Sequence, residues 1–398
     1  MERLTLPSET EVAIVGGGPV GLLLGCLLTL RGVDCMILER RTLPTPESRA
    51  FGIHPPALKV LRTAGVAGEL IRRGVKIAGG QVFVDKTRLG RMSLDATDPT
   101  FPFVLSVPQT VTESVLERRL YELAPGALVR GADVTAAEDK DGGTYLTIKT
   151  VSGGRRARLR ARYVVACDGK HSTLRENANI AFRGGKYPDC YLMGDFADNT
   201  PFGTDAALFV TGGGIVESFP LPGGLRRWVV RLPERMETRD ANDLAAMVRE
   251  RTGFVVPVET CLWMSPFGIE YRLAECFHRK NLFLAGDAAH IVSPIGGQGM
   301  NLGFLDAGEL ATTILFLLNP SEFLVRGKWQ PIPSSYQYEE SRKNAAKTAL
   351  RRAEWNTHLG HPCPVWHPHR ALIWGIVNIP KLRRHFAGAF TMQGLDGK

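Results

Sequence analysis

Glu11 to Gly21 read EVAIVGGGPVG, an apolar run followed at once by a glycine-rich turn. The first five residues have the composition of a buried strand, since β-branched and apolar side chains pack between a sheet and its covering helices. Gly16, Gly18 and Gly21 satisfy G-x-G-x-x-G, in which the glycines allow a sharp turn, close approach to a pyrophosphate and tight helix packing. The stretch therefore predicts a dinucleotide site with the phosphates at a helix N-terminus.

A second strand ends in an acid at the expected distance from this turn. The apolar helix after Gly21 stops at Arg31-Gly32, and residues 33–39 then read VDCMILE. Glu39 lies 18 residues past Gly21, where such units place the carboxylate that binds a ribose. These motifs alone leave open whether the ligand is NAD(P) or FAD.

Length and composition suit a two-domain globular protein. The 398 residues are 44% apolar, and single cores stop growing near roughly 250 residues, so we expect two domains. The first ten residues lack the pattern of a signal peptide, and no uninterrupted apolar stretch has the length of a membrane span. The seven scattered cysteines suit free thiols, so we expect a cytoplasmic protein.

The net charge of +9 is spread along the chain in short clusters. An anionic nucleotide or an acidic substrate explains this excess as well as nucleic acid does. Because the chain has no nucleic-acid module and no long basic block, we do not expect nucleic acid as a partner.

Helix and strand patterns alternate along the chain, so each domain is expected to contain separate segments. The predicted fold class is α/β, with a Rossmann-like nucleotide-binding domain, a discontinuous antiparallel β-sheet domain for the substrate, and C-terminal helices. We assign residues 1–75, 104–179 and 272–330 to the first domain, 76–103 and 180–271 to the second, and 331–398 to the C-terminal helical segment.

Two further strand ends carry an acid beside a glycine. Asp168 to Arg175 read DGKHSTLR, which fits D-G-x-x-S-x-x-R, and Gly286-Asp287 precedes PIGGQGMN, from Pro294 to Asn301. With the glycine-rich turn, these motifs resemble the three fingerprints of the class A flavoprotein monooxygenases, the para-hydroxybenzoate hydroxylase-like family. The resemblance extends from Glu11 to Leu318, and the C-terminal residues are similar to those of aromatic-polyketide hydroxylases.

The resemblance implies that the first domain binds FAD without a covalent bond. Asp168, Gly169 and Arg175 match the motif between FAD and the nicotinamide nucleotide, and Asp287 matches the acid that accepts from the ribityl chain. The full set expected at FAD is Gly16, Gly18, Gly21, Glu39, Arg40, Arg49, Gln109, Asp168, Gly169, Arg175, Gly286, Asp287, Gly297, Gly299, Met300 and Asn301. For Arg49 and Gln109 the alternatives are an exposed loop arginine and a helix-capping glutamine.

The reacting side of the flavin is expected at Pro294, Gly296 and Gly297. A helix N-terminus there would stabilise negative charge on reduced flavin. His290 is a further catalytic candidate, although this family often has a structural histidine at that position. Three aromatic residues are candidates for the substrate pocket, with core packing as the alternative: Phe209, Trp228 and Trp263.

The activity implied by the resemblance is hydroxylation of a phenolic or polycyclic aromatic compound. NADH or NADPH visits transiently to reduce FAD, O2 reacts with the reduced flavin, and a C4a-hydroperoxide passes one oxygen to the ring. One alternative is an FAD-dependent reductase or dehydrogenase akin to the geranylgeranyl reductases, which inserts no oxygen. The other is a nucleotide-binding partner protein without activity. The residues give no expectation for the oligomeric state.

The C-terminal segment has a helical pattern from Tyr336 to Leu359 and a basic amphipathic stretch from Ala371 to Phe390. We expect this stretch to pack over the substrate domain, with a membrane surface as a less favoured alternative. The cluster of histidine, cysteine and proline from His361 to His369 is not expected to bind a metal, because its prolines break helical spacing.

Overall fold

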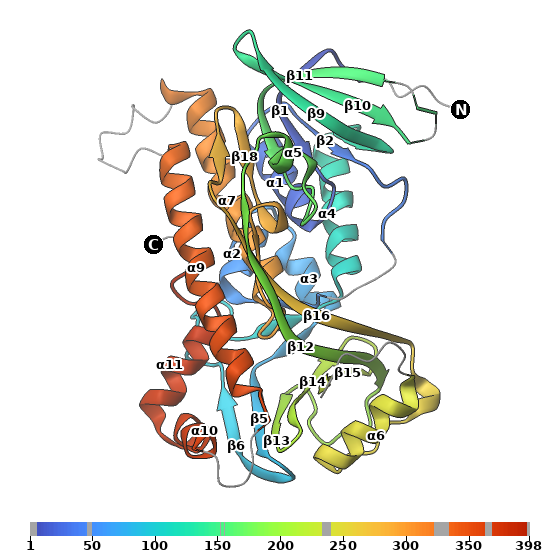
Figure 1. The fold of residues 1–398 in the computed structure, drawn as a ribbon, viewed down its shortest axis with the longest axis vertical. Helices are drawn as coiled ribbons and strands as arrows, with labels where there is room; N and C mark the ends of the chain where they lie inside the picture. Colours follow the sequence, from blue (N-terminus) through green and yellow to red (C-terminus); the bar gives the residue numbers. More distant parts are fainter. Residues whose placement is uncertain are drawn as a thin grey trace.

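The computed structural model describes residues 6–45, 50–151, 153–154, 156–232, 240–321, 334–362 and 368–395. One sheet lies in the upper part of Figure 1 and a second lies in the lower part. Two long strands, β12 (Phe182–Ala197) and β16 (Trp263–Ala274), run from the middle of the molecule into the lower sheet. The mixed α/β fold is as the sequence predicted.

The upper sheet is built on parallel strands that are covered by helices. Its elements are β1 (Glu9–Val15), α1 (Pro19–Thr29), β2 (Cys35–Glu39), α4 (Gln109–Leu123), β8 (Leu128–Arg130), β9 (Ala132–Lys140), β10 (Gly143–Thr150), β11 (Arg156–Ala166), α5 (Thr173–Asn177), β17 (His278–Arg279), β18 (Leu282–Leu284), the 3-10 helix η2 (Gly286–Ala288) and α7 (Gln298–Leu318). The strand order is β17-β18-β11-β1-β2-β8, and β10 and β9 continue from β11 as an antiparallel ribbon. β18, β11, β1, β2 and β8 all run parallel, with α1 packed against α4 and α7.

The lower sheet contains the two long strands and one helical cover. Its other elements are β5 (Gly79–Val84), β6 (Thr87–Ser93), β13 (Ala206–Thr211), β14 (Gly214–Leu221), β15 (Leu225–Leu232), α6 (Ala241–Thr252) and β19 (His290–Ile291). The order is β19-β16-β12-β15-β14-β13-β5-β6. Neighbours are antiparallel except β13 and β5, which run parallel because β5 comes from an earlier, separate visit of the chain to this sheet.

The remaining elements connect or flank the two sheets. They are β3 (Gly52–Ile53), α2 (Pro55–Thr63), α3 (Ala67–Arg73), β4 (Val75–Ile77), β7 (Val104–Ser106), the 3-10 helix η1 (Val258–Thr260), α9 (Ser335–Leu359), α10 (His369–Asn378) and α11 (Pro380–Phe390). β3, β7 and β4 form a small third sheet, and α10 and α11 pack against β6 at the edge of the lower sheet. The domain boundaries predicted above stay our proposal for how the chain divides.

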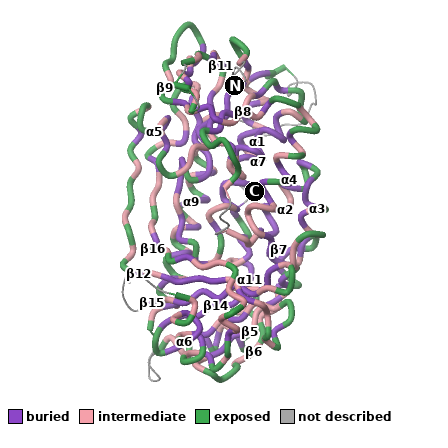
Figure 2. Tube along the Cα trace, turned by 90° about the vertical axis from the view of Figure 1, so that its right-hand side faces the viewer, coloured by how far each residue is buried: buried purple, intermediate pink, exposed green. Residues whose placement is uncertain are grey.

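Buried apolar side chains gather in separate clusters, one around the upper sheet and others on the two faces of the lower sheet. Figure 2 shows buried positions running through both parts of the molecule, with exposed positions at the upper and lower ends. α7, interrupted by Asp306 and Glu309, has the length and hydropathy of a membrane-spanning helix. Most of α7 is buried against α1, α2 and α9, which is the position of a core helix.

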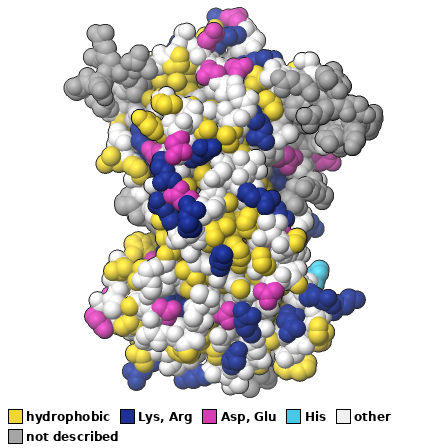
Figure 3. Space-filling model, turned by 180° about the vertical axis from the view of Figure 1, so that it is seen from behind, with side chains coloured by type: hydrophobic (Ala, Val, Ile, Leu, Met, Phe, Trp, Pro, Cys, Tyr) yellow, Lys and Arg dark blue, Asp and Glu magenta, His cyan; other side chains and the backbone are white. Residues whose placement is uncertain are grey.

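The surface carries its excess positive charge in a dispersed form. On the face shown in Figure 3, Lys and Arg side chains are interspersed with acidic and hydrophobic ones. The six cysteines in the described ranges are all free thiols.

Candidate active site

Four strand ends of the upper sheet meet at one edge, and each leads into a predicted motif. In the register of the sheet, Val15 of β1 lies beside Leu38 of β2 and Ala166 of β11, and Ala166 lies beside Leu284 of β18. The glycine-rich turn, Glu39, Asp168 and Gly286 follow these four residues. Ligands of open parallel sheets bind outside the carboxyl ends of the strands, so the alignment assembles one candidate site from distant segments.

The glycine-rich turn is shaped for close packing at two positions and is open at the third. A Cβ on Gly16 would lie 2.2 Å from the Cys167 carbonyl oxygen, and one on Gly21 would lie 2.0 Å from the Gly16 oxygen. A Cβ on Gly18 would meet nothing within 4 Å. Gly18 is also the N-cap of α1, which has no side-chain cap and no acid in its first turn. This helix end therefore offers free N–H groups to an anion.

Glu39 lies beside this turn with both carboxylate oxygens engaged. The backbone N–H of Gly17 donates to Oε2 at 2.6 Å, and that of Arg41 donates to Oε1 at 2.8 Å. Each oxygen keeps a further lone pair for a ribose hydroxyl. Arg40 is exposed at the end of β2, and Arg49 lies outside the described residues.

Gln109 is the first residue of α4 and is half-buried. Its Nε2 donates to Glu113 Oε1, one turn further along, at 2.7 Å. The neighbouring Glu113 is buried, and this burial raises its pKa. The side chain of Gln109 is thus held by its own helix.

The Asp168 loop is fastened to η2 by Arg175. The guanidinium donates to the carbonyl oxygens of Ala288 at 3.1 Å and Lys170 at 3.0 Å, and it lies 3.8 Å from the centre of the Phe182 ring. Asp168 Oδ2 accepts from the Leu174 N–H at 3.3 Å, whereas Oδ1 is buried and has no partner among the described residues. Burial raises the pKa of Asp168. The unpaired oxygen is the kind of group that a bound ligand satisfies.

Gly286 and Asp287 form the start of η2, at the end of β18. Gly286 has φ +61°, and its N–H donates to Asp306 Oδ2 at 2.9 Å. The Asp287 side chain is reached by solvent, yet crowding by protein atoms raises its pKa. Both facts fit a carboxyl group that solvent reaches between crowding protein atoms, where a ligand hydroxyl can donate to it.

His290 lies behind this motif in a buried charged cluster. Its Nε2 is 2.6 Å from Asp306 Oδ2, and Arg342 Nε donates to Asp306 Oδ1 at 2.8 Å. Burial disfavours ionisation of Asp306, but the charges of His290 and Arg342 outweigh it and keep the pKa of Asp306 below its ordinary value. Sequence reasoning named His290 as a catalytic candidate and missed both partners. The buried contact with Asp306 fits the structural histidine that the family resemblance offered as the alternative, and a catalytic role for His290 stays a prediction.

The loop from Ser293 to Gly297 leads into α7 and is held from both sides. Gly297 N–H donates to the Pro294 carbonyl oxygen at 2.8 Å, and His54 Nε2 is 3.1 Å from the Gly296 oxygen. Asn301 accepts from the His54 N–H at 2.8 Å and donates to the oxygens of Gly52 and Gly297. Burial lowers the pKa of His54 to about 4, so its ring is neutral at pH 7.

The N-terminus of α7 is open in the same way as that of α1. Its N-cap, Gly297, has φ +65°, and the helix has no side-chain cap and no acid in its first turn. Gln298 is fully buried, and neither atom of its amide group bonds to a residue in the part of the chain that the structure describes. Gly299 and Met300 are half-buried on the same turn. Such an end stabilises negative charge nearby.

The face of the lower sheet that packs on this loop differs from the predicted one. Ile295 belongs to the same apolar cluster as Tyr191, Val229 and, at its margin, Trp263. Phe209 and Trp228, predicted for the substrate pocket, instead pack with α6 on the opposite face. The reason is strand alternation: successive side chains point to opposite faces, and both faces of β15 are buried, so composition could not reveal the inner one.

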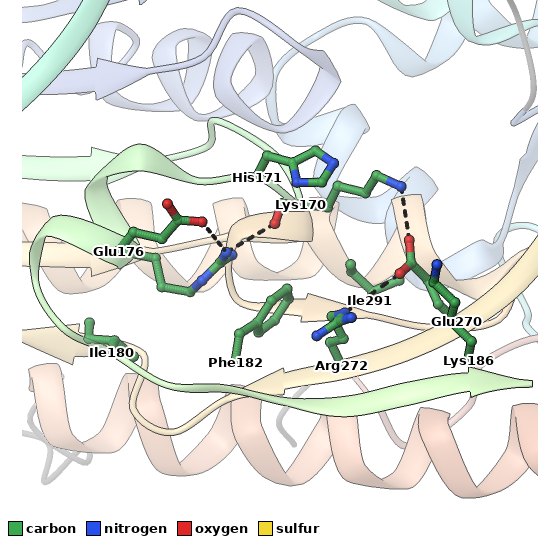
Figure 4. A pocket seen from close by; sticks show the side chains of 10 residues that line it. Lys170, His171, Glu176, Ile180, Phe182, Lys186, Glu270, Arg272 and Ile291 are labelled. Carbon is green, nitrogen blue, oxygen red and sulfur yellow. Dashed lines mark hydrogen bonds and ion pairs between the residues drawn. The ribbon is translucent and has the colours of Figure 1, made fainter.

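A groove of about 440 Å³ opens beside the Asp168 loop. Figure 4 shows Lys170 reaching toward Glu270. Arg175 Nη2 lies 3.8 Å from Glu176 Oε1. Basic side chains predominate in its lining, which includes Lys170, Arg175, Lys186, Arg272, Glu176 and Glu270. The groove therefore suits an anionic ligand.

These features together suit the binding of FAD. The space before Gly18 and the two uncapped helices suit an anionic pyrophosphate and a ring that accepts negative charge. The solvent-accessible carboxyl group of Asp287 suits a polyhydroxylated chain. No group of three or more metal-ligating side chains occurs in the ranges that the structure describes.

Comparison with known proteins gives consistent matches. The family model described as "FAD binding domain" matches residues 9–328. An uncharacterized aromatic compound monooxygenase of Bacillus subtilis is 31% identical, over 96% of this chain and 75% of that protein. Rifampicin monooxygenase of Streptomyces venezuelae is 35% identical, over 75% of this chain and 63% of that protein.

Solved structures agree with the sequence matches. The anhydrotetracycline hydroxylase of Streptomyces rimosus superposes with a TM-score of 0.78 at 29% identity, over 97% of this chain and 76% of that one. The p-nitrophenol 4-monooxygenase of Pseudomonas putida gives a TM-score of 0.86 over 98% of this chain and 100% of that one, although at 24% identity it supports the fold alone.

Proposed function

This chain belongs to the FAD-dependent aromatic monooxygenases, and from that premise we propose that the four aligned strand ends hold FAD beside a phenolic or polycyclic aromatic substrate. The observation that carries the proposal is the register that brings the glycine-rich turn, Glu39, Asp168 and Gly286 to one edge of the sheet. FAD, when bound, supplies electron uptake from NAD(P)H and the activation of O2. The reductase alternative raised above is not favoured by these relatives.

The residues of the chain then bind and orient the cofactor and the substrate, and they exclude water from the site. Gly18 and the start of α1 take the pyrophosphate, Glu39 takes a ribose, and Asp287 takes the ribityl chain. The start of α7 lies near the reacting ring and stabilises its negative charge. The apolar face around Ile295 keeps water from the oxygen-transfer site, which limits loss of oxygen as H2O2.

The basic groove supports a docking place for the reductant. Its cations lie beside the Asp168 loop, which links to η2 through Arg175. A phosphate-bearing nucleotide in this groove would lie next to the FAD motifs. The free thiols support a further proposal, a cytoplasmic location.

The test is turnover of flavin-loaded protein with NADPH or NADH and a panel of phenols and naphthols. We expect hydroxylated product in proportion to O2 consumed, with little H2O2. Product formed under strict anaerobiosis would instead indicate the reductase. A colourless protein that cannot be reconstituted with FAD would indicate a nucleotide-binding partner without activity.

A further inference from the structure

One buried carboxylate of the lower sheet stands apart from its neighbours. Glu217, on β14, is 7% exposed and makes no hydrogen bond or ion pair with any residue that the structure describes. Three other acids, on β12 or just after it, each pair with an arginine of β15: Asp189 with Arg231 at 2.7 Å, Asp195 with Arg227 at 2.6 Å and Asp198 with Arg226 at 2.8 Å. Burial of a carboxylate without a partner costs free energy, so Glu217 is a candidate for binding a ligand.

The register of the sheet directs Glu217 toward the loop before α7. Glu217 lies opposite Val229, and Val229 lies opposite Met193, so the three side chains share one face. Val229 and Met193 belong to the apolar cluster that contains Ile295 of that loop. Glu217 therefore lies on the face where the proposed function places the aromatic substrate.

No cation among the residues that the structure describes pairs with Glu217. Arg227 and Arg231 lie on the same face, but Asp195 and Asp189 respectively neutralise them. The Tyr191 hydroxyl, also on this face, is buried and has no hydrogen-bond partner within the described ranges. Burial together with the charge of Glu217 raises the pKa of Tyr191. Tyr191 thus remains a neutral phenol at physiological pH.

We propose that Glu217 binds the substrate directly, by accepting a hydrogen bond from a hydroxyl or amino group on the aromatic ring. The proposal rests on the proposed function and names the substrate class: neutral aromatic compounds that carry a hydrogen-bond donor. A charged acceptor strengthens such a bond and pushes electron density into the ring that is to be hydroxylated. The same charge repels aromatic carboxylates, so it selects by repulsion as well as by attraction.

The experiment compares binding of 2-naphthol and 2-naphthoate to flavin-loaded protein by equilibrium dialysis at about pH 8, where Glu217 is ionised. Glu217→Gln should weaken 2-naphthol binding about tenfold and strengthen 2-naphthoate binding by a similar factor. Opposite changes for two ligands of similar shape would not arise from a structural role. Glu217→Asp, which keeps the charge, should still reject 2-naphthoate.

The matched control is Glu259→Gln, the same change at an exposed glutamate of η1, which should alter neither affinity. Parallel changes for both ligands, or no change, in a Glu217→Gln protein that retains its flavin would overturn the proposal. Ligand binding is measured without turnover, so the proposed function and the role of Glu217 can be refuted independently of each other. Absence of hydroxylation with the opposite changes intact refutes the function alone, and hydroxylation without them refutes the role of Glu217 alone.

Discussion

Glu217 makes the stability of the protein depend on pH in a definite direction. Burial raises its pKa from 4.5 to about 7, so the folded protein holds a proton there that the unfolded chain releases. The contribution of Glu217 to the free energy of unfolding is constant below pH 4.5 and decreases as the pH rises to about 7. Above that pH the contribution is constant again. The shift corresponds to roughly 3 kcal/mol of unfolding free energy. Glu217→Gln should remove this fall, so the variant should exceed the wild type at pH 8 but not at pH 4.5.

Urea unfolding of both proteins at these two pH values provides the measurement. If the wild type and Glu217→Gln differ by the same amount at both, the carboxylate is not desolvated as the fold implies.

Asp287 should contribute to flavin affinity rather than to folding. Asp287 is exposed at the start of η2, so removing its carboxyl group should leave no buried group unpaired. Asp287→Ala should weaken FAD binding at least about tenfold, the effect of one lost hydrogen bond to a charged acceptor. Flavin fluorescence during titration of the apoprotein measures the change. Asp287→Asn keeps an acceptor oxygen, so its FAD affinity should lie between those of the wild type and Asp287→Ala. An unchanged FAD affinity in Asp287→Ala would refute the assignment of Asp287 to the ribityl chain.

The start of α1 allows cofactor binding to be separated from stability. Gly18 has extended backbone angles and open space before its Cβ position, so an aspartate fits there and can cap the helix. Gly18→Asp should therefore leave unfolding of the apoprotein within about 0.5 kcal/mol of the wild type. Its charge should oppose the pyrophosphate and lower FAD affinity by about a hundredfold or more.

The neutral variant Gly18→Asn is the control for this experiment, since it caps the helix without adding charge. Thermal unfolding of the apoprotein and FAD titration would be followed in parallel. Equal FAD affinities for the two variants would show that the phosphates lie elsewhere.

The cluster of His290, Asp306 and Arg342 joins β19, α7 and α9 across the back of the site, and Asp306 also accepts from the Gly286 N–H of η2. Asp306→Asn would leave the buried Arg342 guanidinium with only the more distant Glu309, 3.8 Å from Nη1, as a counter-charge, which should cost up to about 3–5 kcal/mol. The double variant Asp306→Leu, Arg342→Met removes both charges and should recover part of that loss. Denaturant unfolding of the apoproteins measures both, and a single variant as stable as the wild type would contradict the account.

The molecule as a whole divides into what local sequence encodes and what only folding brings together. The motifs at Gly16, Asp168 and Gly286 are local patterns at strand ends, so the fold and the cofactor were predictable. His54 and Gly296 meet across more than two hundred residues, and no spacing rule links them. The position of Asp306 inside an apolar helix indicates a buried charge, but the sequence does not identify its partners. The inner face of β15 was hidden because both of its faces are buried.

The basic groove leads to a prediction that involves both sheets, since Lys170 follows β11 and Glu270 lies on β16. Lys170→Glu should raise the KM for NAD(P)H by roughly tenfold and weaken its dependence on salt, because an attractive charge becomes repulsive. Flavin content should not change. Initial rates at several ionic strengths measure the effect, with Lys149→Glu, on the exposed side of β10, as the matched control. The same KM in both variants would place the reductant outside the groove.

The spacing of the site along the chain also fixes when the protein can mature during synthesis. The turn at Gly16 to Gly21 leaves the ribosome early, whereas the start of α7 appears only after residue 298 has been made. At about 5–20 residues per second, the first half of the site waits on the order of 15–60 s for the second. A nascent chain must keep β1 and α1 soluble without FAD during that time. Polypeptides released before η2 lack the Gly286-Asp287 motif and the start of α7, so we expect FAD loading to require translation past this point.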